Sequence, residues 1–170
     1  EGVEIPNPTH FADISGLGGG FLSALSTQVI GNSDFYNGAF PAEYNNALSC
    51  VFDMHLRNGN NQKYEHAFQV GLMGIDLASE GPVNKKRGSS YLINYRFSTT
   101  SLATGNDINL KYQDLAFKLN FPTRKAGTFS IWGLGLIDRN KFEKLERSEW
   151  EIMGDRQSGE NKMDKSAGGL

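Results

Sequence analysis

The stretch that decides the fold is Ser90-Tyr91-Leu92-Ile93-Asn94-Tyr95-Arg96-Phe97-Ser98. Side chains alternate between the two faces of a β-strand. One face of this stretch therefore carries large apolar side chains, namely Tyr91, Ile93, Tyr95 and Phe97. The opposite face carries polar ones, namely Ser90, Asn94, Arg96 and Ser98.

A second stretch shows the same pattern. Its apolar side chains are Leu115, Phe117, Leu119 and Phe121, and they alternate with Ala116, Lys118 and Asn120. Strands of this kind suit the wall of a soluble sandwich. They equally suit a membrane barrel that faces lipid outside and water inside. Alternation alone leaves both architectures open, and the choice between them decides the function.

Alternation and turn residues together predict five antiparallel strands, at 64–72, 75–81, 89–98, 110–121 and 128–138. The apolar parity flips beyond Met73-Gly74, which indicates a tight turn or bulge between the first two strands. The strands hold about 7–12 residues each, close to the roughly 9–11 of a tilted membrane strand. The expected fold class is therefore an all-β antiparallel meander.

The remaining residues are expected to be less regular. A short helical turn is predicted at 21–25, a short strand at 34–38 and an alternating segment at 51–57. Residues 139–153 are rich in charge and predict a loop or a short surface helix, and disorder is expected from Gly154 onward. The chain starts at Glu1 without a methionine or signal peptide, so we expect a piece of a longer protein.

Composition excludes several functional classes. The net charge is −2 and lysines and arginines are dispersed, which argues against nucleic acid as a partner. The single cysteine, Cys50, excludes an internal disulfide. No apolar run approaches the ~20 residues of a membrane helix. A length of 170 residues suffices for one domain with a sizeable core.

Few residues suggest metal binding or catalysis. Asp53 and His55 lie two apart on one strand face, but two metal ligands without a third make a weak site. His10 and His66 have no partner signature, and Cys50 is expected to be a small, half-buried residue.

Recognised catalytic motifs are also missing. The glycine run 16–20 lacks the spacing of a phosphate-binding loop, and Glu43 has no second acid at a readable spacing. Neither GxSxG nor HExxH occurs. We therefore expect no enzyme, no catalytic residue, no metal site and no cofactor.

One block carries a family resemblance. Residues 34–53 read DFYNGAFPAEYNNALSCVFD. They resemble the closing stretch of the plug domain in TonB-dependent outer-membrane receptors, in the group where it reads GGFPAEYGxxLSGVxD. Asn45 and Cys50 stand where that pattern has glycine. The matching motif residues, expected to be structural, are Gly38, Phe40, Pro41, Ala42, Glu43, Tyr44 and Ser49.

The resemblance extends over roughly residues 3–138 and implies an architecture. In such receptors an N-terminal plug fills a barrel of about 22 strands. Residues 1–61 would be the end of the plug, and residues 62–138 the first barrel strands. Residues 139–170 would form an extracellular loop. Turns 82–88 and 122–127 would be periplasmic, and 99–109 would be an external loop.

The implied function is that of a receptor and transporter. Such a protein lies in the outer membrane of a Gram-negative-type cell, binds a nutrient outside and imports it with TonB-coupled energy. Its implied partners are the TonB complex (through an upstream part of the parent protein), outer-membrane lipid, an unidentified nutrient and a surface lipoprotein. The expected lipid-facing residues are Tyr91, Ile93, Tyr95, Phe97, Leu115, Phe117, Leu119 and Phe121.

The alternative is a soluble β-sandwich that acts as a binding or adhesion module. Its aromatic side chains would form the core between two sheets. Aromatic girdles of a barrel instead lie near strand ends. Tyr91, Phe97, Phe121 and Phe129 fall near the expected strand ends, which favours the barrel.

Overall fold

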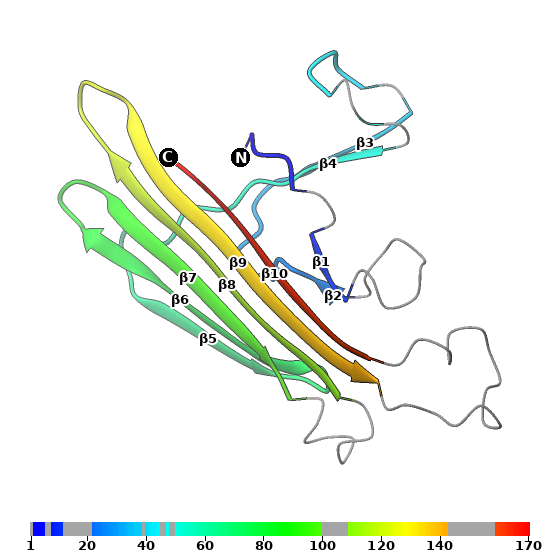
Figure 1. The fold of residues 1–170 in the computed structure, drawn as a ribbon. Helices are drawn as coiled ribbons and strands as arrows, with labels where there is room; N and C mark the ends of the chain where they lie inside the picture. Colours follow the sequence, from blue (N-terminus) through cyan, green and yellow to red (C-terminus); the bar gives the residue numbers. More distant parts are fainter. Residues whose placement is uncertain are drawn as a thin grey trace, which may run out of the picture.

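The regular structure of the chain is entirely β in the residues that the computed structural model describes, which are 2–5, 8–11, 22–38, 40–44, 47, 50–99, 109–142 and 159–170. A six-stranded antiparallel sheet dominates, and two small two-stranded sheets precede it in sequence (Figure 1). No helix among these residues is long and apolar enough to span a membrane. The expected all-β antiparallel class is confirmed.

The large sheet is a meander in which every strand pairs with its neighbours in sequence. Its strands are β5 (Glu65–Val70), β6 (Gly74–Asn84), β7 (Ser89–Ser98), β8 (Asn109–Pro122), β9 (Thr128–Phe142) and β10 (Gly159–Gly169). Within the described part of the chain, β5 and β10 each pair on one side only. The sheet therefore has two open edges.

All five strands expected from the sequence form, with some changes in their bounds. The tight turn between the first two is closed by the N–H of Gly71, which donates to the carbonyl of Gly74 at 2.9 Å. Strand β6 runs on to Asn84 past a register shift at Pro82, so the following turn is shorter than expected. Strand β9 continues to Phe142, into the segment expected to be a loop or helix.

Strand β10 corrects the sequence analysis. Disorder was the expectation after Gly154, and it is wrong for Gly159–Gly169, which pairs with β9 from Trp132 to Phe142. The hydrogen bonds of a ladder join backbone groups. A polar segment without apolar alternation can therefore form a strand when a neighbouring strand offers its edge.

The N-terminal region, residues 1–61, contains the two small sheets. One pairs β1 (Thr9–His10) with β2 (Leu22–Ser23), so the helical turn expected at 21–25 does not form at these two residues. The other pairs β3 (Asp34–Asn37) with β4 (Cys50–Asp53), which confirms the short strand expected near Asp34. Beyond β4, Leu56 makes an isolated bridge with Ile30.

The N-terminal region lies on one side of the curved six-stranded sheet (Figure 1). We call that side the covered face and the opposite side the outer face. The covered face carries the residues expected to be polar, and Asn94 on it is fully buried. An apolar cluster joins the N-terminal region to this face, and its members are Leu25, Val29, Leu56, Leu92, Ala116, Trp132 and Leu134.

The outer face is apolar and open. It carries the alternating large side chains of the sequence analysis, and Phe68 (67% exposed), Phe129 (51%) and Ile93 (41%) are examples. Cross-strand pairs such as Ile93 with Phe117 place these side chains side by side. A sandwich built on the aromatic side chains would bury this face. In the described residues, the buried core is on the other side of the sheet.

Candidate functional site

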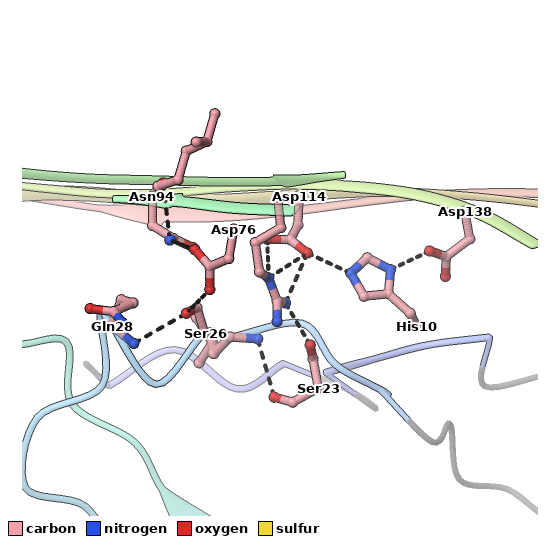
Figure 2. A network of polar contacts seen from close by, with 11 residues as sticks. His10, Ser23, Ser26, Gln28, Asp76, Asn94, Asp114 and Asp138 are labelled. Carbon is pink, nitrogen blue, oxygen red and sulfur yellow. Dashed lines mark hydrogen bonds and ion pairs between the residues drawn. The ribbon is translucent and has the colours of Figure 1, made fainter. Parts of the chain in front are cut away.

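The contact between the N-terminal region and the covered face has a polar part in addition to the apolar cluster. Figure 2 shows its centre, where side chains from β1 and the segment after β2 meet carboxylates and an amide from the sheet. Eight polar or charged residues of the described chain are buried, and six of them take part in these contacts: His10, Ser26, Asn94, Arg96, Asp114 and Asp138. Burial of such groups is costly unless each is paired.

His10 lies between two carboxylates. It is 0% exposed, and its Nε2 is 2.8 Å from Oδ2 of Asp114 on β8. Its Nδ1 contacts Oδ1 of Asp138 on β9 (Figure 2). The backbone N–H of Phe11 donates to the second oxygen of Asp138 at 3.0 Å. The tip of strand β1 is thus fixed to two neighbouring strands of the sheet.

Arg96 on β7 completes this group. Its Nε donates to Oδ1 of Asp114 at 2.9 Å, and its Nη2 lies 2.8 Å from Oδ2. The same Nη2 donates to the backbone carbonyl of Ser23 at 2.6 Å. We call the four residues His10, Arg96, Asp114 and Asp138 the His10 cluster. With His10 protonated, two positive and two negative charges balance.

Geometry and the pKa of His10 agree on its charge. Both ring nitrogens face carboxylate oxygens, and both nitrogens donate only in the protonated imidazole. Burial lowers the pKa of His10, but hydrogen bonds to Asp114 and Asp138 outweigh it, so that the pKa lies above its usual 6.5. The arrangement therefore favours the imidazolium form.

A second polar contact lies beside the His10 cluster. The hydroxyl of Ser26 donates to Asp76 on β6 at 2.6 Å, and the side-chain amide of Asn94 donates to the other oxygen of Asp76 (Figure 2). Ser26 also accepts the backbone N–H of Gln28 at 3.1 Å. Asp76 therefore joins the loop after β2 to two strands of the sheet.

A third contact lies where the N-terminal region passes into β5. Arg57 donates two hydrogen bonds to the carboxylate of Glu80, at 2.8 and 2.6 Å, and a third to the carbonyl of Gln28 at 2.6 Å. The N–H of Asn60 donates to the same carboxylate at 2.7 Å. Lys118 of β8 donates to the carbonyl of Leu56 at 2.8 Å.

The motif residues Phe40, Pro41, Ala42, Glu43 and Tyr44 lie in the connection between β3 and β4. This connection begins at Gly38, whose φ of 93° suits glycine best. The N–H of Tyr44 donates to the carbonyl of Pro41 at 3.0 Å, and its hydroxyl donates to Asp53 at 2.9 Å. The hydrogen bond to Asp53 raises the pKa of Tyr44 to about 12. Tyr44 thus ties the turn to β4.

The other motif residues differ in their exposure. Pro41, Ala42 and Glu43 are exposed, Phe40 is half-buried, and Ser49 lies outside the described residues.

Of the residues considered for chemistry, His10 alone belongs to the His10 cluster among those that the structure describes. Asp53 and His55 contact each other at 3.4 Å, and no group of three potential metal-binding residues occurs in the described ranges. His66 is exposed, and Cys50 is exposed rather than half-buried as expected. Glycines 16–20 lie outside the described residues.

The His10 cluster was missed because its members are far apart in sequence. His10 is 104 residues from Asp114 and 128 from Asp138. A signal was nonetheless present, since Arg96, Asp114 and Asp138 are charged and share the covered face on three neighbouring strands. Inward-facing charges on adjacent strands predict a buried partner.

The arrangement holds two parts of the chain together. The side chains of the His10 cluster are buried, and most of their polar atoms already have protein partners. Comparison with family models, curated proteins and solved structures finds no match to this chain. The functional conclusion therefore depends on the fold and on the residues themselves.

Proposed function

We propose that this chain is the end of the plug and the first strands of the barrel of a TonB-dependent outer-membrane receptor. The whole receptor binds a nutrient outside the cell and imports it to the periplasm with energy from the TonB complex. Residues 1–61 belong to the plug in this proposal, and the six-stranded sheet is part of the barrel wall.

The observation that carries the proposal is the inverted polarity of the sheet. Its polar face is buried by the preceding N-terminal region, while its aromatic face is bare. Soluble proteins rarely leave an apolar surface of this extent exposed. A barrel wall has this polarity, because lipid solvates the outer face and a polar lumen holds the plug.

The connections between strands support the same proposal. Turns 85–88 and 123–127 join strands at one end of the sheet, and the longer segments 99–108 and 143–158 join strands at the other end, where the tight turn between β5 and β6 is an exception. Outer-membrane barrels have short periplasmic turns and longer external loops. The chain enters β5 at the short-turn end, since Glu65 pairs with Glu80 near the turn that follows β6.

The glycines next to large aromatic rings fit a tightly packed wall. A Cβ at Gly133 would lie 2.6 Å from the ring of Phe117 on the neighbouring strand. A Cβ at Gly81 would lie 2.3 Å from the ring of Tyr64. Rings that lie over glycine protect the backbone and complete an apolar surface.

The first test is detergent dependence. The chain is refolded in buffer and in micelles, and its far-UV β signal and solubility are compared. We expect aggregation in buffer and a cooperative β fold in detergent, because the sheet has open edges and a bare apolar face. A monodisperse folded protein in plain buffer would instead favour the soluble binding module.

A sharper test compares the two faces at one depth. Trp132 lies on the covered face, and the next residue, Gly133, pairs in register with Phe117, whose side chain lies on the outer face. One variant carries Trp150→Phe alone, so that Trp132 is its single tryptophan. The other carries Trp132→Phe, Trp150→Phe and Phe117→Trp. Vesicles with brominated acyl chains quench tryptophans that contact lipid.

We expect the tryptophan at position 117 to be quenched and Trp132 to be protected. The depth in the bilayer is the same, so only the face differs. Absence of quenching in both variants would remove the lipid contact, and the membrane proposal would fail.

A further inference from the structure

His10 has a position that suits a proton-dependent lock. It is fully buried, and it joins the first described strand, β1, to two strands of the sheet that lie more than a hundred residues away in sequence. We propose that the proton on His10 locks the N-terminal region onto the covered face, and that loss of this proton loosens the attachment.

The proposal follows from the two ring nitrogens. Neutral imidazole has one N–H and one lone pair. Since Asp114 and Asp138 face the two nitrogens, a neutral His10 would direct its lone pair at a carboxylate. The favourable contact with one of the two strands would become a repulsive one.

Charge balance gives the same result. Arg96 of β7 already forms a pair with Asp114, so Asp138 depends on His10 for its opposite charge. Without the proton the His10 cluster would hold one positive and two negative charges. Among the described residues, the rings of Phe11 and Tyr112 also lie against His10, and Tyr112 is 4.7 Å away between centroids. An uncompensated buried charge is strongly unfavourable.

The direction of the pH effect can be worked out. The pKa of folded His10 is raised above its usual 6.5 by the two carboxylates, although burial opposes this. The stabilisation is therefore complete below about pH 6.5 and is lost as pH rises through the pKa of the folded state.

The inference requires the fold but no membrane. It is tested in detergent if the chain needs detergent, and in buffer if the chain folds there. Failure of the membrane proposal would leave it intact, because the contacts of His10 are the same in either case.

The first measurement is the protonation state of His10. The variant His55→Gln, His66→Gln leaves His10 as the single histidine of the chain, since the sequence has three. Nitrogen-15 NMR then distinguishes imidazolium from the neutral ring. We expect imidazolium at about pH 7, with a midpoint above that of free histidine. A neutral ring at about pH 6 would overturn the proposal.

The second measurement is the attachment itself. Trp132 contacts the apolar cluster that the N-terminal region completes, so its quenching by acrylamide reports detachment. Trp150→Phe serves as the background. As the pH rises from the pKa of His10 in the detached chain to its pKa in the attached chain, we expect acrylamide quenching of Trp132 to increase. Over this interval the ratio of attached to detached chain should fall by up to about tenfold per pH unit. His10→Gln should abolish this dependence, whereas His55→Gln, His66→Gln should keep it. An unchanged profile in His10→Gln would refute the lock.

Asp138→Asn provides a variant that retains His10. It replaces one of the two carboxylates that raise the pKa of His10 by an uncharged amide of nearly the same shape. Both midpoints, by NMR and by quenching, should move together to lower pH. If neither midpoint moves, Asp138 does not hold the proton and the proposal fails.

Discussion

The covered face and the outer face of the six-stranded sheet are made by the same strands. Polar side chains are buried on the covered face, whereas apolar side chains are exposed on the outer face. Asn94 is 0% exposed, while its neighbour Ile93 is 41% exposed. Arg96, Asp114 and Asp138 are buried, and the aromatic rings on the other side are partly or largely open. The hydrophobic effect in water would produce the reverse arrangement. The comparison suggests that each face is suited to a different environment.

The largest expected effect comes from breaking the charge balance of the covered face. Asp114 binds both His10 and Arg96, and Arg96→Met removes one of these two partners. The buried carboxylate then lacks the positive charge of the guanidinium. We expect a loss of about 3–5 kcal/mol in the free energy of unfolding. Urea titration in detergent measures it.

Lys111→Met is the matched control, because Lys111 is exposed on β8, one strand away from Arg96. It should change stability by about 0.5 kcal/mol or less. If Arg96→Met lowered the free energy of unfolding as little as Lys111→Met, the stability of the fold would not depend on the buried charges of the covered face.

Strand positions and faces could be predicted from the sequence because alternation is a local property. The pattern from Ser90 to Ser98 and the pattern from Leu115 to Phe121 both predict the observed faces. Leu92 shows the limit of this reasoning. It interrupts the polar face with an apolar residue, and the structure places it in the cluster that joins the N-terminal region to the sheet.

Contacts between distant segments could not be predicted in the same way. The partners of His10 depend on how the N-terminal region folds back over β8 and β9, which alternation does not encode. Strand β10 was missed for a related reason. Its pairing with β9 depends on an available edge, not on its own polar sequence.

The second prediction concerns the outer face. Ile93→Arg introduces a charge on the face that we propose meets lipid. Near the bilayer midplane this should cost about 2–4 kcal/mol of folding free energy in vesicles. On a surface in water the same change should cost about 0.5 kcal/mol or less. Folding into vesicles under urea titration separates the two values.

Asn94→Arg tests the other face at the next residue. Alternation alone suggests that arginine is tolerated there, but Asn94 is fully buried and its amide donates to Asp76. We expect this variant to detach the N-terminal region and expose Trp132 to quenching, with vesicle insertion retained. Ile93→Arg should instead weaken vesicle insertion and leave the N-terminal region attached. Identical behaviour of the two variants would remove the distinction between the faces.

The third prediction concerns a close approach between the N-terminal region and the sheet. A Cβ at Gly59 would lie 2.0 Å from the carbonyl oxygen of Tyr91, which is backbone and cannot move aside easily. Gly59→Ala should therefore cost about 1–3 kcal/mol of stability. Gly135→Ala is the control, because nothing lies within 4 Å of its Cβ position. Equal stability of the two variants would show that the backbone near Gly59 and Tyr91 shifts to accommodate the added methyl group.

The smallest expected effect is at the junction between the two regions. Arg57→Lys keeps the charge but loses the paired hydrogen bonds to Glu80 and the bond to the carbonyl of Gln28. Since the Arg57 side chain is 33% exposed, solvent screening limits the loss to about 1 kcal/mol or less. Arg87→Lys, in the exposed turn after β6, should have no measurable effect. A loss at Arg57 as large as that of Arg96→Met would mean that the junction, and not the His10 cluster, holds the N-terminal region on the sheet.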